Sequence, residues 1–164
     1  MDSQHSDFVE VKIKALIADP ESQSPVVVLQ HEGQTNLLPI WVGPFEAQAI
    51  AMAIEHIEPP RPMTHDLLLS VIEQAGFTVH TVKVHSLKDN VFRATILLLD
   101  REGRLLSVDS RPSDAFALAV RAQVPIFVAQ AVMNEASVPE YPMEEALKKL
   151  LEKLDPEDLG DYEM

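Results

Sequence analysis

Three prolines, each followed within four residues by an acid, mark the places where this chain is expected to change from extended strand to helix. The three pairs are Pro44 with Glu46, Pro62 with Asp66, and Pro112 with Asp114. Proline suits the first turn of a helix, because the N–H that it lacks would be unpaired there anyway. An acid in the same turn is favoured by the helix dipole and can cap a free N–H. Helices are therefore expected over about 44–57, 64–75 and 112–122.

The segments outside these helices have the pattern of strands. From Phe8 to Ala18, apolar residues alternate with charged ones, as in a half-exposed strand. Further strands are expected over 26–29, 37–42, 77–87, 91–99, 105–108 and 126–128. The first three should form a β-meander. Because strands and helices come in blocks, the expected class is α+β, with a mixed, mostly antiparallel sheet packed around buried helices.

The helix that starts at Pro44 is apolar almost all round, which predicts a central, buried helix. The segment from Phe116 to Val120 likewise predicts a buried helix. Trp41 and Phe45, which flank the first of these helix starts, are expected in the core rather than as platforms for stacking bases.

The 164 residues are expected to form one domain, 1–133, followed by an acidic C-terminal tail, 134–164. Apolar residues spaced three and four apart from Met143 to Leu154 predict an amphipathic helix in that tail. Ten acids and three lysines give the tail a net charge of −7, more than half of the −13 carried by the whole chain. An acidic body disfavours tight nonspecific binding of nucleic acid unless a local basic patch or a divalent metal offsets the repulsion.

The chain has no cysteine, which excludes disulfides, thiolate catalysis and cysteine-based zinc sites. The polar start of the sequence lacks the apolar region of a signal peptide. No apolar run approaches the roughly 20 residues that span a bilayer. A soluble, cytoplasmic protein without a membrane partner is therefore expected.

Most of the chemistry-bearing residues lie at the helix starts. Asp109 to Asp114 form a polar segment between a strand and a helix, and Arg61 and Arg111 each precede a proline. Two interpretations stand at this point. The arginines could hold a phosphodiester while Glu46, Asp66, Asp109 or Asp114 bind Mg²⁺ or Mn²⁺ through oxygen. Alternatively, the arginines neutralise these acids in a buried ion-pair network, and each acid alone is a helix cap.

His65, in the first turn of its helix and next to Asp66, has the position of a general acid or base or of a metal ligand. A surface or capping histidine is the alternative. The sequence contains no P-loop, no GxGxxG and no HExxH motif.

Several segments together resemble the bifunctional nuclease (BFN) family of bacteria and plants. They are Leu38–Gly43 with Glu46-Ala47, Arg61-Pro-Met-Thr-His-Asp-Leu67, Asp109-Ser-Arg-Pro-Ser-Asp-Ala115, and Val124–Val128. The resemblance covers roughly Phe8 to Met133. It implies an α+β fold, a homodimer, and a nuclease that acts on both DNA and RNA.

The function predicted from residues and resemblance together is a nuclease of low sequence specificity that hydrolyses DNA or RNA with a divalent metal. His65, Asp66, Asp109 and Asp114 are expected in catalysis, and Arg61, Arg111 and Ser113 in substrate binding. The expected ligands of Mg²⁺ or Mn²⁺ are Glu46, Asp66, Asp109 and Asp114. The alternative is a non-catalytic dimeric module that binds an anion or a protein partner.

Overall fold

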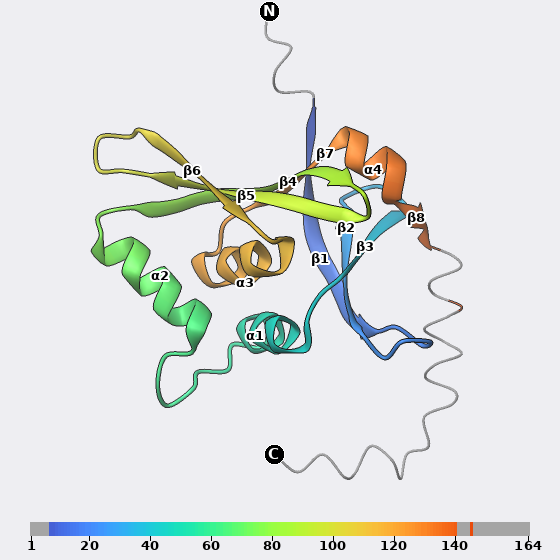
Figure 1. The fold of residues 1–164 in the computed structure, drawn as a ribbon, viewed down its shortest axis with the longest axis horizontal. Helices are drawn as coiled ribbons and strands as arrows, with labels where there is room; N and C mark the ends of the chain where they lie inside the picture. Colours follow the sequence, from blue (N-terminus) through green and yellow to red (C-terminus); the bar gives the residue numbers. More distant parts are fainter. Residues whose placement is uncertain (1–6, 141–144, 146–164) are drawn as a thin grey trace, which may run out of the picture.

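The computed structural model describes residues 7–140 and Glu145, and within them eight strands form one sheet (Figure 1). The order of the strands across the sheet is β6-β5-β4-β7-β1-β2-β3-β8. All neighbouring strands are antiparallel except β4 and β7, which are parallel. The predicted α+β class with a mixed, mostly antiparallel sheet is confirmed.

The sheet consists of two meanders joined through one short strand. The first contains β1 (Phe8–Ala18), β2 (Pro25–His31) and β3 (Asn36–Trp41), as predicted. The second contains β4 (Thr78–Lys88), β5 (Val91–Leu99) and β6 (Leu105–Ser110). β7 (Ile126–Ala129) lies between β4 and β1 and so connects the two meanders.

Helix α3 (Pro112–Ala122) is the buried helix of the fold. Its residues Ala115 to Ala119 are at most 1% exposed, and it contacts β4, β5 and the two helices before it. Those helices are α1 (Pro44–Ile54) and α2 (Thr64–Gln74), and Figure 1 shows all three on the same side of the sheet. The prediction for the segment from Phe116 to Val120 is confirmed.

The expectation of a central, buried helix at Pro44 is wrong. Only Ala47 and Ile50 of α1 are buried, because a short helix beside the more deeply packed α3 presents one narrow face to it. The helix ends at Ile54 rather than near 57, since His56 adopts a left-handed φ of 54° that stops the α-helical hydrogen bonds.

The aromatic pair at the start of α1 is also not core. Trp41 is 55% exposed and Phe45 is 82% exposed. Trp41 ends a strand near the rim of the sheet, where its indole N–H donates to Asp19 at 2.9 Å. Phe45 falls on the outer side of the first helical turn, so its ring does not reach the core.

Two further elements follow β7 where none was predicted. They are α4 (Gln130–Ala136), which contacts β3, β4 and β7, and β8 (Val138–Pro139), which pairs with β3. Both extend past residue 133, where the body of the chain was expected to end. The amphipathic helix predicted over Met143–Leu154 lies outside the described residues. Within those residues, no helix is long and apolar enough to cross a bilayer.

Replacing Phe116 by alanine should lower the free energy of unfolding by about 3–5 kcal/mol, because it leaves a cavity under the sheet. Phe116 is fully buried, whereas Phe45 of α1 is largely exposed. Phe45→Ala should change stability by less than about 0.5 kcal/mol. Urea unfolding of both variants measures the difference. Similar losses in the two variants would show that Phe45 packs into the core after all.

Candidate functional site

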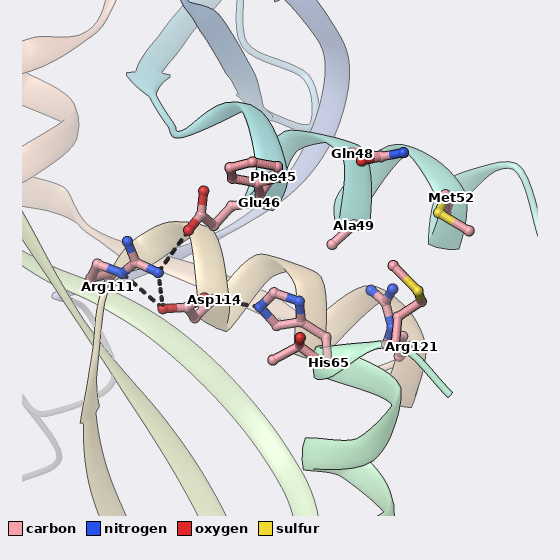
Figure 2. Close-up of a pocket in the computed structure, with 11 residues that line it drawn as sticks. Phe45, Glu46, Gln48, Ala49, Met52, His65, Arg111, Asp114 and Arg121 are labelled. Carbon is pink, nitrogen blue, oxygen red and sulfur yellow. Dashed lines mark hydrogen bonds and ion pairs between the residues drawn. The ribbon is translucent and has the colours of Figure 1, made fainter. Parts of the chain in front are cut away.

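The first turns of α1, α2 and α3 meet at one pocket with a volume of about 310 Å³ (Figure 2). Each helix places at least one titratable side chain there from its start: Glu46 from α1, His65 from α2 and Asp114 from α3. The pocket is lined by Phe45, Glu46, Gln48, Ala49, Met52, Met63, Thr64, His65, Arg111, Asp114 and Arg121. The three proline-led segments, distant in sequence, therefore converge.

Arg111 lies between two carboxylates at the edge of this pocket. Its Nε atom donates to Asp114 Oδ2 at 2.9 Å, and its Nη2 atom lies 3.0 Å from Glu46 Oε1 and 2.8 Å from Asp114 Oδ2. The hydrogen bonds to Asp114 and then Glu46 raise the pKa of Arg111 above its usual value, so the guanidinium stays charged. Its side chain is still 64% exposed, which differs from the buried ion pair expected as the alternative.

The third guanidinium nitrogen, Nη1, makes no hydrogen bond to any described residue, and Figure 2 shows no dashed line to it. Arg111 therefore keeps two N–H donors for a ligand while its other nitrogens hold the side chain in place.

His65 is buried beside this cluster and is neither a surface nor a capping histidine. Its Nε2 atom lies 2.9 Å from Asp114 Oδ1, and the residue is 8% exposed. A carboxylate only accepts hydrogen bonds, so Asp114 assigns the proton of neutral His65 to Nε2 and leaves the lone pair on Nδ1. No fully buried side-chain nitrogen or oxygen of the described residues lacks a partner. Since Nδ1 has none among those residues, it is not fully buried, and His65 lines the pocket.

Asp66 caps its helix and pairs with an arginine, which is the structural role that the sequence offered as the alternative for each acid. Its Oδ2 atom accepts from the Met63 N–H at 2.9 Å, which caps α2. Its Oδ1 atom accepts from Arg121 Nε at 2.8 Å. Burial raises the pKa of Asp66, but these hydrogen bonds, first from Arg121 and then from Met63, outweigh it and lower the pKa below the usual value.

Arg121 is the residue of this site that sequence reasoning missed. Its side chain is only 9% exposed, and it joins the last turn of α3 to the first turn of α2. The sequence did contain a signal for this residue, because Arg121 is the one charged residue after Asp114 in an otherwise apolar helix. It follows Asp114 by seven residues, or two helical turns, and so lies on the same face.

Glu46 and Asp114 make no side-chain hydrogen bond that caps their helices. Glu46 instead folds back over Gly43, where an added Cβ would lie 2.2 Å from its Oε2 atom. A glycine before Pro44 therefore leaves room for the carboxylate that holds Arg111.

Besides Asp66, which pairs with Arg121, three other predicted site residues lie outside the pocket. Asp109 is exposed on β6, opposite Thr95 of β5. Arg61 is exposed in the loop before α2, and Ser113 is buried in α3. None of them lines the pocket. The two Arg-Pro segments are similar in sequence, but only Arg111, and not Arg61, lies at the pocket.

The four expected metal ligands are likewise not gathered. In the part of the chain that the structure describes, no three His, Asp or Glu side chains are grouped closely enough to hold a metal ion. Glu46 and Asp114 share Arg111, Asp66 faces Arg121, and Asp109 stands apart. These residues do not present a ready three-ligand site for Mg²⁺ or Mn²⁺, and the need for a metal stays a prediction.

A family model for the bifunctional nuclease domain matches residues 27–141, more than two thirds of the chain and all the pocket residues. The chain belongs to the bifunctional nuclease domain family. The predicted resemblance is confirmed.

Relatives of this BFN-domain chain fall into two kinds. An uncharacterized protein of Mycobacterium tuberculosis is 35% identical over 162 residues, which cover 91% of this chain and 96% of that protein. Bifunctional nuclease 2 of Oryza sativa subsp. japonica is 32% identical over 66% of this chain. Bifunctional nuclease 1 of Arabidopsis thaliana is 30% identical over 63% of it. The matched regions are 35% and 33% of those plant proteins, which are therefore much longer.

The ion pair of Asp66 makes the stability of the BFN domain depend on pH. The pKa of Asp66 is lowered in the folded chain, so ionised Asp66 stabilises the fold above the unfolded pKa of about 3.9. This contribution is lost as the pH falls through the folded pKa. Between about pH 5 and about pH 3, Asp66→Asn should therefore lose less free energy of unfolding than the wild type.

Urea unfolding at both pH values measures this difference. Asp89→Asn is the matched control, because Asp89 is exposed in the turn between β4 and β5 and forms no ion pair with a described residue. The control should follow the wild type. Equal acid losses in Asp66→Asn and the wild type would contradict the assigned role of the ion pair.

Proposed function

We propose that this chain is a nuclease that cleaves phosphodiester bonds at the pocket formed by the first turns of α1, α2 and α3. One observation carries the proposal. A fixed guanidinium with free N–H donors lies beside a histidine that the same aspartate orients, in a pocket open to solvent. The BFN family and the nucleases named among its plant members support it.

Arg111 is the group that binds phosphate. Its Nη1 hydrogens form a fork for one or two phosphate oxygens, while Glu46 and Asp114 prevent the side chain from swinging away. The first turns of the three helices add the positive ends of their dipoles. Because this field is fixed before the substrate arrives, it stabilises the charge that develops on phosphorus-bound oxygen in the transition state.

His65 is the general base. Its Nδ1 atom takes a proton from the attacking water molecule as the new O–P bond forms, and the bond from phosphorus to the leaving oxygen breaks. The leaving oxygen then takes a proton from protonated His65 or from water. Asp114 accepts from Nε2–H throughout and stabilises the imidazolium that forms.

Asp66 and Arg121 are positioning residues in this proposal. Their ion pair fixes the first turn of α2 to the end of α3, and His65 is the neighbour of Asp66 in that turn. Arg121 also donates to the Ala117 carbonyl at 2.9 Å, so the guanidinium is held at both ends.

A non-catalytic dimeric module that binds a small anion or a protein partner is the second candidate, and one observation favours it. Glu46 and Asp114 together overcompensate Arg111, so the three groups carry a net charge of −1 in a chain of net charge −13. On that interpretation the same groups only join the three helices.

Cleavage of labelled single-stranded and double-stranded DNA and RNA tests the nuclease. His65→Gln should lower the rate by about 10²–10⁴-fold, because the general base is lost. Arg111→Ala should lower it by about 10²–10³-fold, because the transition-state charge is then unpaired. Asp114→Asn should lower it as well, since a neutral amide does not stabilise the imidazolium that forms.

Arg93→Ala is the matched control, since Arg93 is exposed on β5 and does not line the pocket. Thermal unfolding shows which variants are folded. Folded His65→Gln and Arg111→Ala proteins that cleave at the wild-type rate would exclude this pocket as the source of the activity. That result would favour the second candidate.

A divalent metal is a separate proposal, and the proton transfers of His65 do not require one. If Mg²⁺ or Mn²⁺ takes part, Glu46 and Asp114 are the pocket carboxylates available to it. Cleavage should then stop in EDTA, and Glu46→Gln should weaken Mn²⁺ binding in calorimetry by about tenfold or more. Undiminished cleavage in EDTA, with no heat of Mn²⁺ binding, would contradict a metal requirement.

A further inference from the structure

Phe45 is an exposed aromatic ring at the entrance of the catalytic pocket. It is the second residue of α1, is 82% exposed and lines the pocket. Figure 2 shows its ring next to Glu46, on the side of the pocket where Arg111 lies. Glu46, the next residue in the sequence, contacts Arg111 directly, and all three residues line the same pocket.

The fold does not need this ring. Phe45 forms no part of the hydrophobic core, and the pocket that it lines contains charged side chains, Glu46 and Arg111 among them, beside apolar ones. An interface between copies of a chain usually buries a continuous apolar centre. The exposed apolar side chains Leu67 and Val71 of α2 fit that description, whereas Phe45 lines a pocket in which charged and apolar side chains are mixed.

Charge alone does not attract nucleic acid to this pocket. The cluster of Glu46, Asp114 and Arg111 is negative when His65 is neutral, and the whole chain is strongly acidic. Affinity for a polyanion therefore needs, besides the contact with Arg111, one that does not depend on charge. Stacking of a base on an aromatic side chain supplies about 1–3 kcal/mol per base and needs no cation.

We infer that Phe45 stacks on an unpaired base and thereby places the adjacent phosphodiester on Arg111, so that the substrate is single-stranded DNA or RNA. A base within a duplex is already stacked on both faces and does not offer its ring to Phe45. This inference rests on the proposed function and adds to it the substrate class and a substrate-binding residue.

Fluorescence anisotropy of a labelled oligonucleotide tests the inference on the full-length chain. His65→Gln is the background for every variant, so that the probe stays intact. The probes are a single-stranded 12-mer of DNA, the same 12-mer of RNA, and each annealed to its complement. Phe45→Ala should weaken binding of the single strands by about 5- to 150-fold, the equivalent of one lost base stack. Phe45→Tyr should restore it.

Leu105→Ala is the matched control, because Leu105 is a 61% exposed apolar residue on the edge strand β6 and does not line this pocket. It should bind like the background protein. The affinity for a single strand should also fall only weakly with salt, with a slope near −0.7 in a double-logarithmic plot, as one arginine–phosphate contact predicts.

Three results would overturn the inference. They are equal affinity of the background protein and Phe45→Ala for single strands, equal affinity of the background protein for duplex and single strands, and a Phe45→Ala protein that binds normally but forms smaller assemblies in light scattering. The last result would place Phe45 in a contact between copies.

Failure of the nuclease is distinguishable from failure of this inference. A wild-type protein that binds single strands through Phe45 but cleaves none refutes the cleavage and leaves the stacking supported. A wild-type protein that cleaves, with rates unaffected by Phe45→Ala, keeps the nuclease and refutes the stacking.

Discussion

The burial of α3 between the sheet and its two neighbouring helices is the constraint on which the candidate site depends. Five consecutive residues, Ala115 to Ala119, are sealed from solvent, so the helix has no freedom to rotate or slide. Its first turn therefore holds Asp114 and Arg111 at a defined place, and its last turn holds Arg121. Since α1 and α2 pack on this helix, their first turns are positioned by the same burial.

Electrostatics then divides the polar residues around α3 into two groups. Asp66 and Arg121 form an ion pair at the first turn of α2, and the arginine side chain is almost fully buried. Arg111 belongs to the second group, because it is largely exposed and keeps N–H donors after pairing with Glu46 and Asp114. Of the two groups, only this exposed one has the capacity to bind an anion. This division favours a catalytic role for Arg111 and His65 and a structural role for Asp66.

The fold was largely predictable from sequence because its signals are local. Strands β1 and β5 and helix α3 begin and end within a residue of their predicted limits, since alternation and proline-led starts depend on neighbouring residues. The depth of α1 was not predictable in the same way. A helix rich in alanine looks equally apolar on each side, and only the packing of α3 decides which side is covered. For the same reason Phe45 was assigned to the core although it lies in solvent.

By itself, the sequence determined where α1, α2 and α3 begin, which polar residues stand at those beginnings, and membership in the BFN domain family. Only the tertiary structure decided which of these residues meet. His65 joins Asp114 across 49 positions and Arg111 joins Glu46 across 65, whereas Asp109, five residues before Asp114, points from a strand and stays outside. The physical reason is that hydrogen bonds between distant segments depend on strand register and helix packing. A local pattern of residues does not encode either of them.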